Sequence, residues 1–341
     1  MAVPVIALTG YLGAGKTTLL NHVLRRPDAR IGLVINDFGE INVDAGLVTG
    51  QVDEPASIAG GCICCLPDDG GLDVALEKLS DPKLRLDAII VEASGLAEPA
   101  ALARIIRFSG VDNVRPGGVV DVIDAVNHFQ TVDTEALPPA RYSASSLVVV
   151  NKLDQLTESD REPLLDRVSE RIRVANPGAQ IVGASRGRID PALLYDIADA
   201  GEEYGQLSLR DLLVQDEPPA DGHHHHDHSH ADSVSVTGDG CVDPGAILDL
   251  CENPPPGVYR LKGTFAVRYR SSVRHYVVNL VGAGVHIDTA PGTKGSALVA
   301  IGMNLDRDDV AARLRAALTP VDGPAPAAGV KRLQRYRRLS I

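Results

Sequence analysis

The sequence predicts an α/β domain built on a mainly parallel sheet, followed by a smaller C-terminal α+β domain. Apolar, β-branched runs alternate with helical patterns through the first 215 or so of the 341 residues. Such alternation is typical of a parallel sheet covered on both faces. A second observation is a change of composition near Gln215, after which prolines, acidic residues, serines and histidines occupy residues 217–240. We therefore expect four segments: an α/β domain at 1–215, a His-rich flexible linker at 216–240, an α+β domain at 241–318 and a basic, disordered tail at 319–341.

In the first domain, each strand is expected where an apolar run of four to seven residues is bounded by polar or turn-forming residues. These runs cover residues 3–9, 31–36, 88–91, 119–123, 147–150 and 181–184. Helices are expected from Thr18, over 99–108 and over about 160–175, the last with Pro177 beyond its end. Ligands of such folds bind at the carboxyl ends of the strands.

The second domain should begin with a short helix from Pro244 to Leu250, capped by Asp243. Strands are expected over 259–267, 274–281 and 296–301, and a helix over 306–318. Beyond Pro320 the chain carries five basic residues, Lys331, Arg332, Arg335, Arg337 and Arg338. We interpret this tail as a solvated end, with a docking arm for an acidic partner as the alternative.

Bulk properties exclude several classes of protein. A formal net charge of −12 argues against broad binding to nucleic acid. The N-terminus lacks the features of a secretory signal, and no apolar run approaches the ~20 residues of a membrane-spanning helix. A cytoplasmic protein without membrane contact is therefore expected. Three of the five cysteines lie within four residues, which indicates metal or redox chemistry rather than a disulfide scaffold.

The segment from Gly10 to Thr17 fits the phosphate-binding pattern G-x-x-x-x-G-K-[ST], between an expected strand and an expected helix. This arrangement aims backbone N–H groups and a helix N-terminus at phosphates. Lys16 is expected to reach the β- and γ-phosphates and Thr17 to bind Mg²⁺. The loop residues expected to hold the nucleotide are Gly10, Gly13, Ala14, Gly15, Lys16, Thr17 and Thr18.

The tetrapeptide Asn151-Lys152-Leu153-Asp154 follows the expected strand at 147–150. The carboxylate of Asp154 can accept two hydrogen bonds from guanine, whereas adenine lacks that pair of donors. Asn151 would tie this loop to the phosphate loop, and Lys152 would lie along the base. The backbone N–H of Ala184, at the end of the next strand, is expected to reach guanine O6.

Glu92 and Gly95 follow the expected strand at 88–91. The carboxylate of Glu92 can hold Mg²⁺ through water, and the Gly95 N–H can contact a γ-phosphate. The alternative is that these residues only form a capping turn before the next helix. The catalytic candidates are Lys16, Thr17 and Glu92, and the sequence shows no certain general base.

Cys62, Cys64 and Cys65 are soft ligands suited to Zn²⁺ or Cu(I). A tetrahedral Zn²⁺ would need a further ligand, for which Asp37 and Glu40 are candidates. Two alternative interpretations of these cysteines are small core residues in a turn and a redox pair. The histidines between residues 223 and 230 indicate either weak binding of several divalent metal ions or a solvated linker.

Together these motifs resemble the CobW-like family of P-loop GTPases. The resemblance rests on residues 10–17, the C-x-C-C element at 62–65, residues 92–95 and residues 151–154, and it covers about 3–318. It implies a SIMIBI-type GTPase domain, GTP hydrolysis with Mg²⁺, and Zn²⁺, or less favourably Co²⁺, on the three cysteines. It also implies a client metalloprotein as partner, with a homodimer as one option.

The resulting hypothesis is a metallochaperone GTPase that couples nucleotide state to metal transfer. Two alternatives stay open: a passive zinc buffer, and a GTP-dependent assembly or regulatory protein with a structural metal site. A small-molecule kinase is less favoured, because residues 151–154 indicate guanine and no acceptor site is evident.

Overall fold

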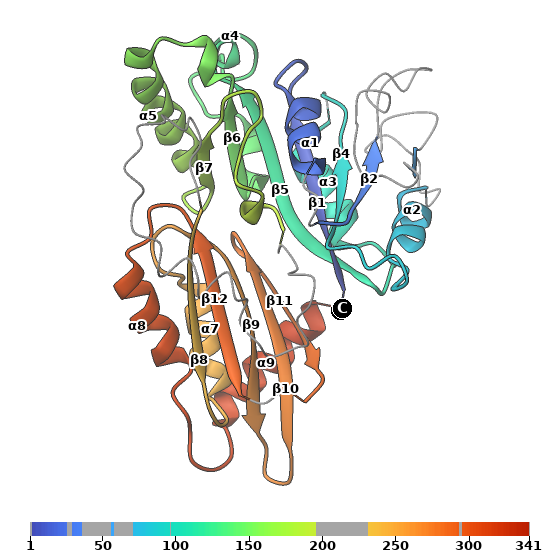
Figure 1. Cartoon of the computed structure of the whole chain (residues 1–341), viewed down its shortest axis with the longest axis vertical. Helices are drawn as coiled ribbons and strands as arrows, with labels where there is room; N and C mark the ends of the chain where they lie inside the picture. Colours follow the sequence, from blue (N-terminus) through green and yellow to red (C-terminus); the bar gives the residue numbers. More distant parts are fainter. Residues whose placement is uncertain are drawn as a thin grey trace. The chain divides into compact units, whose positions relative to one another are not determined.

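The computed structural model describes residues 2–25, 29–35, 56–57, 71–95, 97–195, 231–292 and 295–340. The chain divides into two compact units: the described residues up to Tyr195 belong to the first, and those from Ala231 onward belong to the second. Figure 1 shows a parallel sheet in the first unit and an antiparallel sheet in the second. No helix within the described ranges has both the length and the apolarity to cross a bilayer.

The sheet of the first unit has seven strands in the order β3-β2-β4-β1-β5-β6-β7, and every pairing between them is parallel. The strands are β1 (Val3–Gly10), β2 (Ile31–Ile35), β3 (Ala56–Ser57), β4 (Ala88–Glu92), β5 (Val114–Asp124), β6 (Leu147–Asn151) and β7 (Gln180–Gly183). The predicted parallel α/β architecture is confirmed. Because β1 is the central strand, the loop that follows it lies midway along the carboxyl edge of the sheet.

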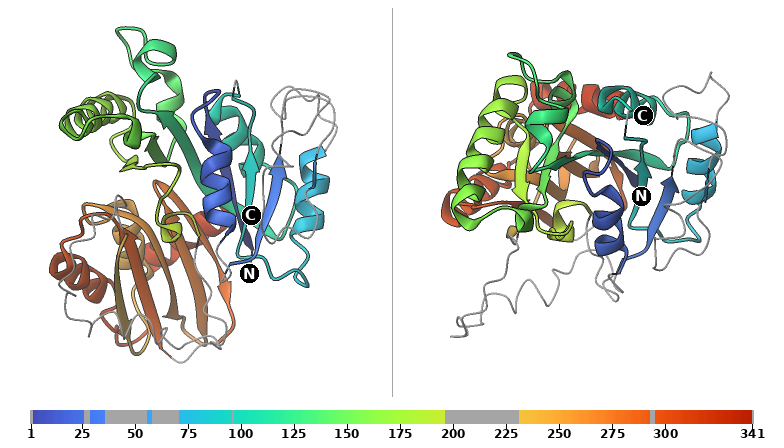
Figure 2. Two further views of the ribbon diagram at one scale, coloured as in Figure 1. Left: turned by 45° about the horizontal axis from the view of Figure 1, so that its top comes forward. Right: turned by 90° about the horizontal axis from the view of Figure 1, so that it is seen from above.

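The helices of the first unit pack on this sheet through apolar residues, and Figure 2 shows them from two further directions. They are α1 (Lys16–Leu24), α2 (Gly71–Leu79), α3 (Pro99–Arg107), α4 (His128–Thr131) and α5 (Glu158–Ala175), with the 3₁₀ turns η2 (Ala140–Ala144), η3 (Leu153–Gln155) and η4 (Pro191–Leu193). Leu76 of α2 and Leu102 of α3 share one core with Val5 of β1. Val168 and Ile172 of α5 share a second core with β6. Burial of these faces is the main source of helix stability.

The second unit contains a five-stranded antiparallel sheet in the order β11-β10-β9-β12-β8. Its strands are β8 (Asp232–Gly238), β9 (Val258–Arg268), β10 (Val273–Val281), β11 (Gly284–Ala290) and β12 (Ser296–Gly302), and its helices are α7 (Pro244–Glu252), α8 (Arg307–Ala317) and α9 (Ala327–Leu339). The buried residues Phe265, Val278 and Leu298 of the sheet share a core with Ile247 of α7 and Leu314 of α8. Asp243 caps α7 as predicted, since its Oδ1 accepts from Gly245 N at 2.8 Å.

Two expectations about the limits of this unit are wrong. Strand β8 pairs with β12, so the folded unit starts well before residue 241. The tail from 319 is not disordered, because its residues 327–339 form α9, in which Leu333 is fully buried in the core. Arg332 of α9 forms ion pairs with Asp249 and Glu252 of α7 at 2.7 and 2.9 Å. The basic composition of this segment did not predict a packed helix, because only a minority of the side chains of α9 are buried.

Candidate functional site

The phosphate-binding pattern lies between β1 and α1 and has the backbone shape that its glycines predict. Gly10, Gly13 and Gly15 all have positive φ values, of 146°, 76° and 101°. A Cβ atom at Gly10 would stand 2.6 Å from the carbonyl oxygen of Val122, a distance that real Cβ atoms do not show. The loop is closed by a hydrogen bond from Ala14 N to Tyr11 O at 3.1 Å. Its curvature therefore depends on residues without a side chain.

Lys16 and Thr17 begin α1 directly after the left-handed Gly15. The Nζ of Lys16 donates to the carbonyl oxygen of Gly10 at 3.1 Å, so the side chain reaches back across the loop. The first turn of a helix leaves its N–H groups without intrahelical partners. The first turn of α1 contains the half-buried Lys16 and Thr17 and the exposed Thr18. This loop can therefore hold an anion.

Asn151, at the end of β6, connects the two loops that the sequence singles out. Its side chain is 1% exposed. Its Nδ2 donates to Ala14 O at 3.0 Å, and its Oδ1 accepts from Gly187 N at 2.8 Å. The predicted link from Asn151 to the phosphate loop is thus present in the geometry. One buried amide fixes the phosphate loop relative to both β6 and the segment after β7.

Lys152 and Asp154 lie in the turn that follows Asn151. Lys152 has a left-handed backbone, with φ of 67°, and its Nζ lies 2.8 Å from Asp124 Oδ2. Asp154 Oδ1 accepts from Arg186 N at 3.2 Å, and the side chain stays 26% exposed. The carboxylate of Asp154 is therefore accessible at the carboxyl edge of the sheet, beside the segment that contains Gly187.

The expectation for Ala184 is wrong. Its backbone N–H donates to the carbonyl oxygen of Val150 at 2.9 Å, and its own carbonyl accepts from Leu153 N at 3.1 Å. Ala184 is also buried, with 1% exposure. Both of its backbone groups therefore serve the edge of the sheet, and its N–H is not available to a base.

Glu92 and Gly95 stand beside the phosphate loop on the β4 side. Glu92 is the last residue of β4, is 2% exposed, and is in register with Leu8 of β1. A Cβ atom at Gly95 would stand 2.8 Å from the backbone nitrogen of Leu12. The segment after β4 therefore packs directly on the phosphate loop, and a side chain at Gly95 would separate the two.

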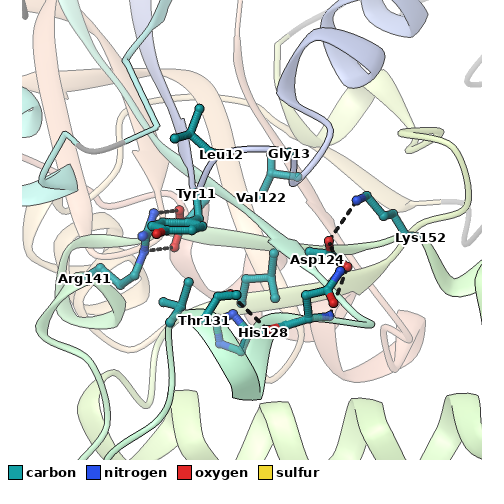
Figure 3. A pocket seen from close by; sticks show the side chains of 13 residues that line it. Tyr11, Leu12, Gly13, Val122, Asp124, His128, Thr131, Arg141 and Lys152 are labelled. Atoms are coloured by element: carbon teal, nitrogen blue, oxygen red, sulfur yellow. Dashed lines mark hydrogen bonds and ion pairs between the residues drawn. The ribbon is translucent and has the colours of Figure 1, made fainter. Parts of the chain in front are cut away.

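A cavity of about 260 Å³ opens on the β5 side of the phosphate loop (Figure 3). It is lined by Tyr11, Leu12, Gly13, Asp121, Val122, Ile123, Asp124, Asn127, His128, Thr131, Val132, Arg141 and Lys152. Although burial acts to raise the pKa of Asp124, hydrogen bonds from Asn127 and Lys152 lower it below its ordinary value. Asp124 is thus an anion that holds Lys152 in place.

The sequence analysis missed the charged residues behind this cavity. Asp121 and Asp124 interrupt the apolar run of β5, and Asp121 is fully buried. A carboxylate inside an otherwise apolar strand costs free energy unless it has a partner. That signal, visible in the run Val-Val-Asp-Val-Ile-Asp at 119–124, could have identified both residues.

A second buried cluster fastens α4 and η2 to α5. His128 Nε2 contacts the Tyr142 hydroxyl, which donates to Asp133 Oδ2 at 3.1 Å. Arg171 pairs with Asp133 and donates to the carbonyls of Ala136 and Glu135 at 2.7 and 2.9 Å. Burial lowers the pKa of His128 to about 4, so the imidazole is neutral at pH 7.

The expected metal ligands Cys62, Cys64, Cys65, Asp37 and Glu40 lie outside the described residues, as does the histidine cluster at 223–230. Among the residues that are described, no group of three or more His, Cys, Asp or Glu side chains converges on one point. Cys241 and Cys251 are free and buried, in agreement with a packing role, and burial raises the pKa of the Cys251 thiol to about 12.

Comparison with known proteins covers both units. Residues 4–183 match the family model described as CobW/HypB/UreG, nucleotide-binding domain, and residues 231–318 match the cobalamin synthesis protein cobW C-terminal domain. The zinc chaperone CobW of Sinorhizobium sp is 30% identical over 93% of this chain and 96% of its own length.

Two further relatives match the chain in part. The zinc chaperone YjiA of Escherichia coli is 28% identical over 57% of this chain and 61% of its own length. The zinc-regulated GTPase metalloprotein activator 1 of Schizosaccharomyces pombe is 32% identical over 55% of this chain and 47% of its own length. The first family model alone spans more than half of the 341 residues, and the first relative aligns over more than nine-tenths of both chains. As its motifs implied, the chain therefore belongs to the CobW-like family of P-loop GTPases.

Proposed function

We propose that this protein hydrolyses GTP, binds Zn²⁺ at Cys62, Cys64 and Cys65, and couples its nucleotide state to transfer of the metal to a client protein. The observation that carries the nucleotide part is the Asn151 amide, which joins Ala14 of the phosphate loop to Gly187 beside Asp154. In this proposal, the same amide would hold the phosphate site and the base-recognition site at a fixed separation. The names of the relatives, zinc chaperone and zinc-regulated GTPase metalloprotein activator, support the metal part.

The reaction needs few groups from the protein, because phosphoryl transfer depends on positioning and charge. Lys16 and the N–H groups of the loop would hold the β- and γ-phosphates, and Thr17 would bind Mg²⁺. Glu92, buried at the end of β4, would orient the metal ion through water. The Gly95 N–H would contact the γ-phosphate, because this residue already packs against Leu12. When bound, Mg²⁺ neutralises the charge that develops on the phosphates.

Base recognition is tested by Asp154→Asn. The amide would present a donor where guanine also presents one, so GTP affinity should fall while affinity for the xanthine nucleotide should rise. The measurement is a titration of wild type and variant with fluorescent guanine and xanthine nucleotides. Asp160→Asn, in the exposed first turn of α5, is the matched control. Unchanged GTP affinity in Asp154→Asn would contradict the guanine assignment.

The metal part is tested by a competitive Zn²⁺ titration against a chromophoric chelator, with residues 223–230 deleted to remove the histidine cluster. Affinity is compared between GDP and a non-hydrolysable GTP analogue, in the intact cysteine site and in Cys64→Ala/Cys65→Ala. A nucleotide-dependent affinity that disappears in the cysteine variant is expected, since coupling between two ligands is reciprocal. Equal Zn²⁺ affinity in both nucleotide states would favour a passive buffer or a structural metal site instead.

A further inference from the structure

The cavity beside the phosphate loop differs in its lining from the site expected to hold the nucleotide. Residues 11–13 of the loop border it, but the described residues that line it include none from 14–18 and do not include Asp154. Only Gly13 and Lys152 belong to both sets. A molecule in the cavity would therefore lie on the β5 side of the loop, without using most of the groups expected to hold phosphates.

Arg141 of η2 lines this cavity with hydrogen-bond donors that no described residue uses (Figure 3). Its Nε donates to Asp121 Oδ2 at 2.9 Å and its Nη2 to Oδ1 at 2.7 Å. The hydroxyl of Thr9 donates to the same Oδ1 at 3.0 Å, so the carboxylate is held from two sides. Nη1 of Arg141 has no hydrogen-bond partner in the described part of the chain. The edge of the guanidinium formed by Nη1 and Nη2 can therefore bind a second carboxylate in bidentate form.

The other Arg–Asp pair of this unit does not leave donors open in this way. Arg171 pairs with Asp133, and it also donates to the carbonyl oxygens of Ala136 and Glu135 at 2.7 and 2.9 Å. Arg171 does not line the cavity. The open donors of Arg141 are thus a feature of the cavity wall.

A chain of hydrogen bonds fixes the tautomer of His128, which also lines the cavity. Although burial acts to raise the pKa of Asp133, hydrogen bonds from Arg171 and Tyr142 lower it below its ordinary value, so Asp133 is an anion. The Tyr142 hydroxyl donates to Asp133 Oδ2 at 3.1 Å and therefore accepts the proton of His128 Nε2. Because the imidazole is neutral at pH 7, its Nδ1 is left as an acceptor. This Nδ1 has no hydrogen-bond partner among the described residues, and it is not sealed from solvent.

The remaining wall suits a small organic molecule with one negative charge. Leu12, Ile123 and Val132 supply apolar side chains, and the volume of 260 Å³ lies below the roughly 300–1,000 Å³ of pockets for drug-sized ligands. The charged residues of the wall form two ion pairs, Asp121 with Arg141 and Asp124 with Lys152. Because these charges cancel, the wall offers little to repay the larger desolvation cost of a dianion.

We propose that this cavity binds a small hydroxycarboxylate, whose carboxylate pairs with Arg141 and whose hydroxyl donates to Nδ1 of His128. The site is additional to the proposed nucleotide and metal sites and does not depend on either. Because the ligand would lie against Tyr11 and Gly13, any effect that it has on nucleotide affinity must be matched by an equal effect of the nucleotide on its own affinity.

The test is an NMR titration of the full-length protein labelled with ¹⁵N at histidine, in which the signals of His128 are identified by their loss in His128→Gln. The probes are glycolate and 3-hydroxybutyrate, two hydroxycarboxylates of different length, with acetate and glycolamide as analogues that lack the hydroxyl and the charge. The better hydroxycarboxylate should shift the Nδ1 resonance with a Kd of about 1 mM, since so few atoms can supply little more affinity. Acetate should bind about fivefold more weakly, and glycolamide at least about tenfold. Equal affinities for all four probes, or no saturable binding of either hydroxycarboxylate, would overturn the proposal.

Two kinds of variant locate the binding. Arg141→Gln should weaken it at least about tenfold, and Arg141→Lys should weaken it less because the charge is kept. Since loss of Arg141 leaves Asp121 without its partner and can unfold the protein, Val132→Phe supplies an independent test: its ring would fill the cavity and touch neither ion pair. Val126→Phe, at an exposed position outside the cavity wall, is the matched control and should stay within about twofold of wild type. Wild-type affinity in Val132→Phe, or in a folded Arg141→Gln protein, would contradict the assignment.

Repeating the titration with saturating GDP distinguishes the cavity from the phosphate loop. A hydroxycarboxylate in the cavity should stay bound, with its Kd changed by less than about tenfold. Complete displacement by GDP would place the carboxylate at the loop and overturn the proposal. A protein that binds the hydroxycarboxylate but no guanine nucleotide would overturn the proposed function and still support the cavity site.

Discussion

Replacing Asn151 by alanine removes the amide that joins the phosphate loop to the segment after β7. Two buried groups lose their partners, the carbonyl of Ala14 and the N–H of Gly187. Leaving a buried polar group without a hydrogen bond costs about 1–3 kcal/mol. Because water can enter the space left by the side chain, we expect a total of about 2–4 kcal/mol. This loss is divided between the stability of the unliganded protein and its affinity for GTP.

The assay is urea unfolding without nucleotide, combined with titration of a fluorescent GTP analogue. If the whole loss fell on binding, affinity would fall between about 30-fold and 1,000-fold. Asn176→Ala is the matched control, because Asn176 also makes hydrogen bonds through both ends of its amide, to Ser145 O at 2.8 Å and from Gly178 N at 3.2 Å. It precedes β7 and therefore lies at the amino edge of the sheet, whereas both loops lie at the carboxyl edge. It should lose stability and keep its GTP affinity. An Asn151→Ala protein with wild-type unfolding and wild-type GTP affinity would refute the reasoning.

Two further predictions concern stability alone. Burial lowers the pKa of His128 from 6.5 to about 4. On acidification, His128 therefore takes up a proton in the unfolded chain before it does so in the folded protein. The free energy of unfolding should fall by about 2 kcal/mol between pH 7 and pH 5. In urea unfolding His128→Gln should lack this part of the pH dependence, and an identical slope in both proteins would contradict the assignment. Leu333→Ala, in the core of the second unit, should cost about 2–5 kcal/mol, whereas Leu339→Ala, 60% exposed, should cost under about 0.5 kcal/mol. Equal denaturant midpoints for these two variants would show that α9 is not part of the folded core.

The central sheet could be predicted because its strands are buried on both faces. Runs such as 147–150 are continuously apolar, and the structure extends this one by a single residue. The phosphate loop could be predicted because its glycines are required by the backbone conformation itself, as Gly10 and Gly15 show. Asn151 was placed correctly for a similar reason: a motif at the end of a parallel strand must lie at the carboxyl edge.

The predictions for Ala184, β8 and α9 failed for one physical reason: contacts between segments far apart in the sequence determine which groups pair and which side chains are buried. The Ala184 N–H was assigned from its position along the chain, but the carbonyl of Val150 occupies it. Likewise, β8 is half-polar, and it forms because β12 offers it a partner. Helix α9 carries few apolar residues, and Leu333 is buried only because α7 and the sheet surround it. No local pattern contains these partners.

The burial of α9 has a consequence for synthesis of the chain on the ribosome. The described part of the first unit is complete once the chain has been made through Tyr195, beyond β7, so this unit can fold while the second is still being translated. The second unit cannot close its core until Leu333 is available, and Ser340 Oγ accepts a hydrogen bond from Ile287 N at 3.0 Å. The last strand of its sheet, β12, ends at Gly302, so part of the apolar face of the sheet stays uncovered while the next 31 residues, up to Leu333, are made. Premature termination before Leu333 would release a chain with one finished domain and one open core.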